Sequence, residues 1–309
     1  MANITAKDVA ALRAKTGLGM MDCKKALVEA DGDFDAAIKI LREKGLATAA
    51  KKESRIAAEG VVDILTENGV TAMIEVNTET DFVAKNASFR EFVKGLLRTL
   101  VANKPADMDA FTALPFDGGD NTVANTLVEQ IAVIGEKISI RRFVIVEGIT
   151  STYIHGNGTT GVIVKFDTDA ADKAEFADFA KNIALQIAAG SPPTYVAKED
   201  VPQAAIDEEL QIQITAAKND EKLANKPDAV LAKIVEGKLG KLFFDKVCLL
   251  EQDYVKDDSI KVGKYVEQTA KALGGSIKVV GFEIFEKGEG IQKREEDFAA
   301  EISKMVNKQ

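Results

Sequence analysis

The sequence has little of the residue types on which catalytic and cross-linked sites depend. Its 309 residues include one histidine, two cysteines and no tryptophan. A serine or cysteine nucleophile would have only His155 as a base, and no cluster has the ligand spacing of a zinc site. Cys23 and Cys248 lie far apart, which is typical of a reduced compartment and not of a disulfide framework. The sequence therefore predicts a protein that is not an enzyme and binds no cofactor or metal.

Long apolar runs and an excess of positive charge are also missing. No stretch approaches 18 uninterrupted apolar residues, and residues 1–7 lack the basic region and apolar run of a secretory signal. We therefore expect a cytoplasmic protein without membrane contact. The net charge of −9 argues against direct binding of nucleic acid, because such binding requires Lys and Arg to neutralise phosphates.

The first 55 residues predict a small three-helix bundle. Thr5 can cap the first helix, and Thr16-Gly17 can end it. The next two helices carry apolar stripes at Met20, Cys23, Leu27 and Ala30, and at Phe34, Ala37, Ile38 and Leu41. Gly45 is predicted to cap the end of the third helix, and Ala47 to Arg55 is expected to be a solvated helix or linker.

From Gly60 the apolar pattern changes to the period of two that is typical of strands. Asn68-Gly69 predicts a type I′ turn between two alternating runs, and a strand is predicted later at Ile138 to Val146. Between them, Ser88-x-x-Glu91 is a capping box ahead of a helical apolar face. That face consists of Phe89, Phe92, Val93, Leu96, Leu97 and Leu100. A further helix is predicted near Val123 to Ile134.

The same order of elements recurs in the second half of the chain. A hairpin is predicted from Tyr153 to Phe166, followed by a helix that carries Phe176 and Phe179 and by a late strand at Ile277 to Phe285. A polar insertion, Gln203 to Asp245, interrupts this half and is broken near Pro227, which predicts a helical hairpin. The recurrence indicates two related halves of one core.

The predicted fold class is therefore α+β. It comprises an N-terminal three-helix bundle, two related α+β core halves with antiparallel sheets, an inserted helical hairpin and a C-terminal helix. The expected domains are 1–55 for the bundle and linker, 56–149 for the first core half, 150–202 with 246–286 for the second core half, 203–245 for the hairpin and 287–309 for the C-terminal helical module.

One motif suggests a nucleotide-dependent enzyme. Gly156-Asn157-Gly158-Thr159-Thr160-Gly161 matches the dinucleotide fingerprint G-x-G-x-x-G. That fingerprint requires a helix to begin at its third glycine, whereas Val162 to Phe166 continues as a strand. We interpret the motif as a hairpin turn. A nicotinamide-dependent enzyme remains a competing hypothesis that rests on this motif alone.

The segment from Thr78 to Asn86 places an aromatic residue between a carboxylate and a short apolar run. Read from the residues alone, it is a helix start in which Thr80 caps the helix while Phe82 and Val83 pack underneath. The alternative is that Phe82 projects from the surface.

This segment and the segment from Thr16 to Leu27 together resemble bacterial elongation factor Ts. The likeness extends over almost the whole chain, and its other matching stretches include Lys137 to Arg142, His155-Gly156, Val235 to Lys238 and Gly288 to Ile291. Members of this family are exchange factors that release GDP from the translational GTPase elongation factor Tu. The resemblance implies the same partner, and it implies a UBA-like fold for the N-terminal bundle.

The resemblance also implies which residues contact the partner. The element that would insert beside the partner's magnesium site is Thr80, Asp81, Phe82 and Val83. The other implied contacts are Arg13, Met20, Met21 and His155. The inserted hairpin is a candidate contact for homodimers, as related arms are in some members.

Plainer interpretations of these residues stay open. One of Met20 and Met21 is expected in the bundle core, because a methionine at helical spacing is usually buried. His155 beside a glycine turn could be an incidental surface residue. The run of Lys51, Lys52 and Arg55 is expected to be solvated. A non-catalytic adaptor, whose partner keeps the same nucleotide affinity, is the alternative function.

Overall fold

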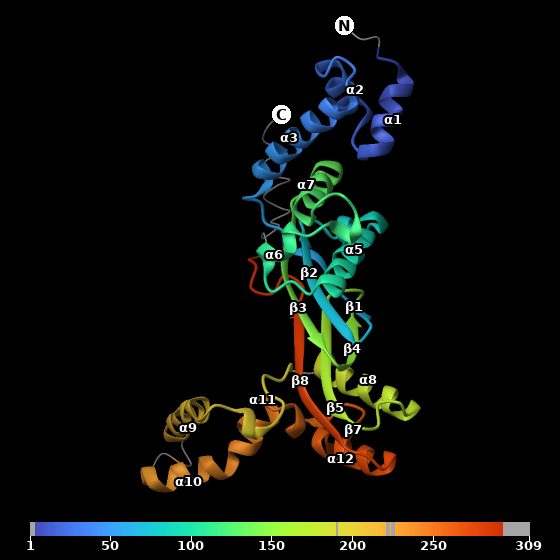
Figure 1. The fold of residues 1–309 in the computed structure, drawn as a ribbon. Helices are drawn as coiled ribbons and strands as arrows, with labels where there is room; N and C mark the ends of the chain where they lie inside the picture. The colour runs from blue at the N-terminus through green and yellow to red at the C-terminus, as the bar shows by residue number, and fades with distance from the viewer. Residues whose placement is uncertain (1–3, 190, 221–222, 224–225, 293–309) are drawn as a thin grey trace. The chain divides into compact units, whose positions relative to one another are not determined.

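The structure, a computed structural model, describes residues 4–189, 191–220, 223 and 226–292. The chain forms two compact units. Figure 1 labels their helices and strands. Unit 1 contains residues 4–65, 74–143 and 286–292 of the described chain, and unit 2 contains Thr66–Met73 and Val144–Phe285. No helix in the described ranges is long and apolar enough to cross a membrane. The five predicted domains stay a prediction.

Unit 1 begins with the three-helix bundle, formed by α1 (Ala6–Thr16), α2 (Met20–Glu29) and α3 (Phe34–Lys52). Thr5 caps α1 as predicted: its hydroxyl accepts from the Asp8 amide at 3.3 Å, and the Asp8 carboxylate accepts from the Thr5 amide at 2.9 Å. Gly17 ends α1 with a φ of 70°. The bundle core consists of Val9, Leu12, Cys23, Ala26, Leu27, Ala37 and Leu41.

The predicted cap at Gly45 is wrong, because α3 continues through this residue to Lys52. Gly45 lies where α3 approaches α7 (Val123–Ile134), and a Cβ atom here would lie 3.3 Å from Val128 Cγ1. The glycine thus allows close packing of two helices and does not supply a left-handed cap. The stretch from Ala47 is accordingly helical as far as Lys52.

The first sheet lies mostly in unit 1, and its strands have the order β1-β2-β3. Its strands are β1 (Glu59–Glu67), β2 (Val70–Thr78) and β3 (Ile138–Glu147). The predicted turn is confirmed, since Asn68 and Gly69 have φ values of 50° and 75°. Residues 71–78 of β2 are all buried, as befits a central strand.

Helix α5 (Ala87–Asn103) buries all six apolar residues predicted for its face. The predicted cap at Ser88 is wrong. Asn86 caps the helix instead, and its Oδ1 accepts from the Ser88 amide at 2.8 Å. Asn86 has the extended backbone of a cap residue, with ψ 133°, whereas Ser88 already lies inside the helix. Short helices α4 (Asp81–Lys85) and α6 (Met108–Ala113) flank α5 in the sequence.

A buried carboxylate joins three segments of unit 1. The Glu75 side chain is fully buried and accepts hydrogen bonds from Arg141 Nη1 at 3.0 Å, Arg142 Nε at 2.7 Å and the Gly288 amide at 2.7 Å. Burial by itself raises the pKa of this carboxyl, but these donors and the Asn77 amide outweigh burial and hold the pKa below its ordinary value. Glu75 is therefore ionised and connects β2 to β3 and to the last described segment.

The second sheet repeats the arrangement of the first, with a hairpin and a late strand in the order β4-β5-β8. It comprises β4 (Ile149–His155), β5 (Thr160–Thr168) and β8 (Ile277–Glu286). The β4–β5 pair is antiparallel and runs from Ile149 opposite Phe166 to His155 opposite Thr160. Helix α8 (Ala174–Ala189) buries Phe176 and Phe179 in the unit 2 core. The predicted α+β class and the internal repeat are confirmed.

The inserted helical hairpin consists of α9 (Gln203–Lys218) and α10 (Asp228–Leu239), which lie side by side in Figure 1. Its core is small, with Ala217, Leu231 and Val235 buried. A π-helical turn, Gly240–Phe244, follows α10. The predicted C-terminal helix near Lys293 to Met305 lies outside the described residues.

The sequence interpretation missed α12 (Val262–Leu273) and a small antiparallel pair, β6 (Asp253–Tyr254) and β7 (Asp257–Lys261). The elements not yet named are η1 (Phe116–Gly118), η2 (Lys198–Asp200), α11 (Asp245–Val247) and η4 (Leu249–Glu251). Val262 and Val266 of α12 are buried in the unit 2 core. Cys23 and Cys248 are free and buried.

Candidate functional site

The segment singled out in the sequence forms a short surface helix, α4, that begins after Thr80. The Thr80 hydroxyl accepts from the Val83 amide at 3.4 Å, so the predicted cap is confirmed. Ala84 is buried at 4% exposure and attaches the helix to unit 1. The expectation that Phe82 packs underneath is wrong, because Phe82 is 82% exposed. It is the most exposed large apolar side chain among the residues that the structure describes.

Asp81 lies beside Phe82 on α4 and is charged. Its Oδ2 accepts from Lys85 Nζ at 2.5 Å, one helical turn along. This hydrogen bond lowers the pKa of Asp81 below its ordinary value. The carboxylate remains about half exposed, so it can exchange the lysine for another donor. The segment therefore presents an aromatic ring next to an available negative charge.

The loop after α7 holds the backbone just before α4. Glu136 Oε1 accepts from the Thr80 hydroxyl at 2.6 Å, and Glu136 Oε2 accepts from the Thr80 amide at 3.0 Å. On the other side, the Thr78 hydroxyl donates to the Thr80 carbonyl at 2.9 Å. Thr80 is thus engaged through its hydroxyl, its amide and its carbonyl within unit 1.

A second set of contacts holds Glu79. Its Oε1 accepts from the Lys137 amide at 2.6 Å, and both carboxylate oxygens lie 3.3 Å from Arg55 Nη1. Lys137 Nζ also donates to the Arg55 carbonyl at 3.0 Å. Lys52 Nζ donates to the carbonyl of Gly135. Lys51 and Arg55 are exposed, which confirms the prediction of a solvated run for these two residues, whereas Lys52 is half-buried.

The other expected contact residues lie on exposed surfaces. Arg13 is exposed on α1, and Met20 and Met21, at the start of α2, are 42% and 62% exposed. The expectation that one methionine enters the bundle core is wrong, because Cys23 and Leu27 already occupy the buried face of α2. All of these residues belong to unit 1.

His155 is exposed at the end of β4 and belongs to unit 2. Its Nδ1 lies 3.2 Å from the Tyr153 hydroxyl. The glycine-rich motif that follows is a hairpin turn as predicted, with positive φ at Gly156, Asn157 and Gly158. Strand β5 begins at Thr160, so no helix opens at the third glycine of the motif.

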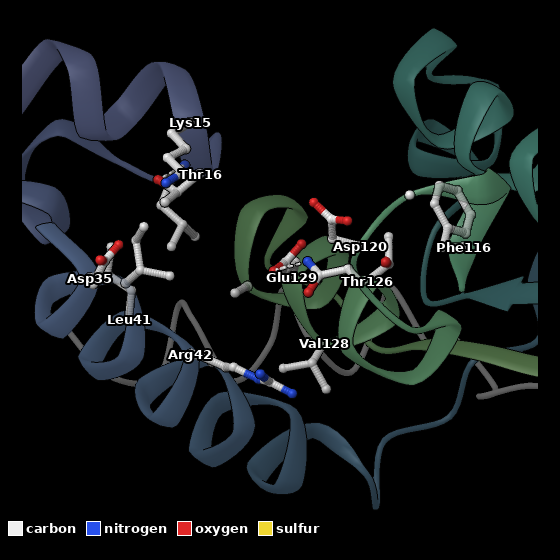
Figure 2. Close-up of a pocket in the computed structure, with 16 residues that line it drawn as sticks. Lys15, Thr16, Asp35, Leu41, Arg42, Phe116, Asp120, Thr126, Val128 and Glu129 are labelled. Carbon is white, nitrogen blue, oxygen red and sulfur yellow. Dashed lines mark hydrogen bonds between the residues drawn. The ribbon is translucent and has the colours of Figure 1, made fainter. Parts of the chain in front are cut away.

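A groove of about 590 Å³ lies within unit 1 between α3 and α7 (Figure 2). Figure 2 shows Leu41 and Arg42 of α3 on one side and Val128 and Glu129 of α7 on the other. Cationic and acidic side chains both line it, and it contains no histidine or cysteine. In the described part of the chain, no cluster of three or more His, Cys, Asp or Glu could hold a metal ion.

Comparison with known proteins identifies the family. The family model described as elongation factor TS matches residues 79–289, a range that includes α4 and both sheets' late strands. The chain belongs to the elongation factor Ts family. It is thereby a translation elongation factor, and the resemblance stated from the sequence is confirmed.

Members of the elongation factor Ts family from several bacteria are similar along nearly their whole length. The protein named elongation factor Ts from Syntrophotalea carbinolica is 46% identical over 98% of this chain and 99% of its own length. The one from Clostridioides difficile is 45% identical over 99% of this chain and 100% of its own length. The one from Trichlorobacter lovleyi is 43% identical over 97% of both chains. These relatives also cover the N-terminal bundle, which the family model does not.

Proposed function

We propose that this chain is a guanine nucleotide exchange factor for elongation factor Tu. It binds the GDP-loaded partner, disturbs the partner's magnesium and phosphate site and promotes release of GDP. The observation that carries the proposal is the exposure of Phe82, at 82%, on a segment in which Glu136 and Thr78 hold the Thr80 backbone. An apolar ring in water gains free energy when a partner buries it, and exposed apolar groups of this kind mark interaction sites.

In this proposal the residues from Thr80 to Val83 form the element that enters the partner. Phe82 displaces side chains beside the magnesium site, and Asp81 bonds to the surrounding elements of the partner. Asp81 is suited to this because its present partner, Lys85, holds it through a solvent-exposed ion pair that is readily exchanged.

Exchange requires the factor to bind the empty partner more tightly than the loaded one. By linkage, GDP then weakens binding of the factor by the same ratio. A thousandfold faster release corresponds to about 4 kcal/mol. Burial of one phenylalanine contributes roughly 2 to 3 kcal/mol, so a second contact region is needed. Arg13, Met20 and Met21 on the bundle and His155 on β4 are proposed for it.

The proposal places the protein in the cytoplasm with its partner and assigns it no chemical step of its own. The inserted hairpin as a homodimer contact stays a prediction, which sedimentation equilibrium of the isolated protein checks. An adaptor without exchange activity would bind elongation factor Tu and leave its GDP release rate unchanged.

Asp81→Ala is expected to slow GDP release about tenfold, because a charge-assisted hydrogen bond to the partner is lost. The measurement is stopped-flow release of a fluorescent GDP analogue from loaded elongation factor Tu. Asp109→Ala is the matched control, since Asp109 is also an exposed acid in the first turn of a short helix. Equal rates for Asp81→Ala and the unmodified protein, with the fold intact, would contradict the role given to Asp81.

A further inference from the structure

We infer that Glu136 is a positioning residue for exchange. Its carboxylate anchors Thr80 and so fixes the direction in which Phe82 leaves the surface before any partner is bound. This inference rests on the exchange function proposed above. It assigns to Glu136, a residue outside the α4 segment, control over the orientation of that segment.

The contact joins two segments far apart in sequence through a reciprocal arrangement. The Glu136 side chain accepts from the Thr80 backbone amide at 3.0 Å, and the Glu79 side chain accepts from the Lys137 backbone amide at 2.6 Å. Each segment thus supplies one carboxylate and one amide. The same reciprocity defines a capping box, in which two backbone donors are satisfied together. Here it joins residues 79–80 to residues 136–137.

The loop that carries Glu136 is itself fixed. Gly135 ends α7 in the left-handed conformation, with a φ of 82°, and its carbonyl accepts from Lys52 Nζ. Directly after Lys137, β3 begins at Ile138, which is 3% exposed. Glu136 therefore extends from a short connection held between a helix end and a buried strand start. Because this connection is fixed at both ends, the Glu136 carboxylate can hold Thr80 in one position.

Helix α4 needs an external anchor because it is too short to be stable alone. It spans five residues, whereas isolated helices below about 12 residues are marginal in water. The Thr80 hydroxyl both donates to Glu136 Oε1 at 2.6 Å and accepts from the Val83 amide at 3.4 Å. Glu136 therefore orients the cap of the helix that carries Phe82. Fixing this geometry in the free protein reduces the ordering that association would otherwise require.

The first test measures positioning without a partner. The chain has no tryptophan, so Phe82→Trp introduces a single indole at the relevant position. We expect Glu136→Ala in this background to add a fast, large-amplitude component to the anisotropy decay of that indole. Glu129→Ala is the matched control, because Glu129 is a half-buried glutamate of the preceding helix that binds Asn121 at 2.8 Å. Its substitution should leave the decay unchanged.

The second test measures exchange in the chain that retains Phe82. Glu136→Ala is expected to lower the second-order rate constant of GDP release about tenfold, equivalent to roughly 1.4 kcal/mol. Glu136→Gln should restore most of the loss, because its amide can accept from the Thr80 amide and donate to the Thr80 hydroxyl. Thr80→Val should slow release on its own, and its effect should be smaller in the Glu136→Ala background, because the bond from the Thr80 hydroxyl to Glu136 is already absent there.

The outcomes separate the two proposals. An unchanged indole decay in Glu136→Ala, or a full exchange rate in that variant, would overturn the positioning role. If the unmodified protein itself fails to accelerate GDP release, the proposed function falls, while the anisotropy result still decides whether Glu136 orders the segment. If Glu136→Ala does not fold, Thr80→Val, which removes the hydroxyl donor to Glu136 Oε1, decides by the anisotropy decay of the indole in Phe82→Trp.

Discussion

Phe82→Ala is expected to slow GDP release from elongation factor Tu about 50-fold, since burial of a phenylalanine ring is worth roughly 2 to 3 kcal/mol. The free energy of unfolding should change by less than about 0.5 kcal/mol, because a side chain that is 82% exposed contributes little to the folded state. Stopped-flow release of a fluorescent GDP analogue measures the first effect, and urea denaturation followed by circular dichroism measures the second.

Two variants make this result specific to the ring at Phe82. Phe82→Leu retains part of the apolar area and should fall between the unmodified protein and Phe82→Ala. Val255→Ala removes another exposed apolar side chain, 50% exposed in unit 2, and should leave exchange unchanged. A normal rate for folded Phe82→Ala would remove the main support for the proposed function.

Glu75→Gln is expected to lower the free energy of unfolding by about 3 kcal/mol, because it leaves the cations of a buried ion pair without their anion. The carboxylate is fully buried, while Arg141 and Arg142 are 28% and 30% exposed, so water can reach part of each guanidinium. Because water can reach them, the expected loss in the free energy of unfolding lies at the lower end of the range for broken buried ion pairs. Urea denaturation at pH 7 measures it.

The stability difference between Glu75→Gln and the unmodified protein should decrease at low pH. The pKa of Glu75 is lower in the folded protein than its ordinary value, so its contribution is complete above about pH 5 and disappears as the pH falls through the folded pKa. The difference between the two proteins should therefore shrink below about pH 4. Glu289→Gln is the control, since Glu289 binds Arg142 at 2.9 Å but is 57% exposed and should cost under about 1 kcal/mol. A constant difference down to pH 2 would contradict an ionised Glu75.

Local patterns predicted most helices and strands because each was specified by side chains near in sequence. The errors arose where one residue type serves two purposes. Gly45 has the sequence signature of a helix end, but a glycine is also required where α3 approaches Val128, and only the packing partner distinguishes these uses. Ser88 and Asn86 are both cap formers, and the choice depends on where the backbone turns helical. Helix α12, by contrast, was detectable from the helical spacing of Val262, Val266 and Leu273.

The candidate site was predictable only in part, because some of its features depend on residues far away in the sequence. The helix start at Thr80 follows from local sequence, and the family resemblance directed attention to Phe82. The exposure of Phe82 did not follow from its local sequence, because whether an aromatic side chain is buried depends on what the rest of the fold places around it. Glu136 was missed altogether: its contact with Thr80 spans 56 residues, and a single glutamate in a loop carries no local signal.

The Glu75 contact with Gly288 has a consequence for how the chain folds during its own synthesis. The two residues are separated by 213 positions, and at bacterial rates of about 5 to 20 residues per second the amide of Gly288 is made about 10 to 40 s after Glu75. Most of unit 2 is continuous and lies within that interval. The segment that carries Gly288 is therefore made after most of unit 2, so unit 2 can finish folding while the Glu75 carboxylate still lacks one of its donors.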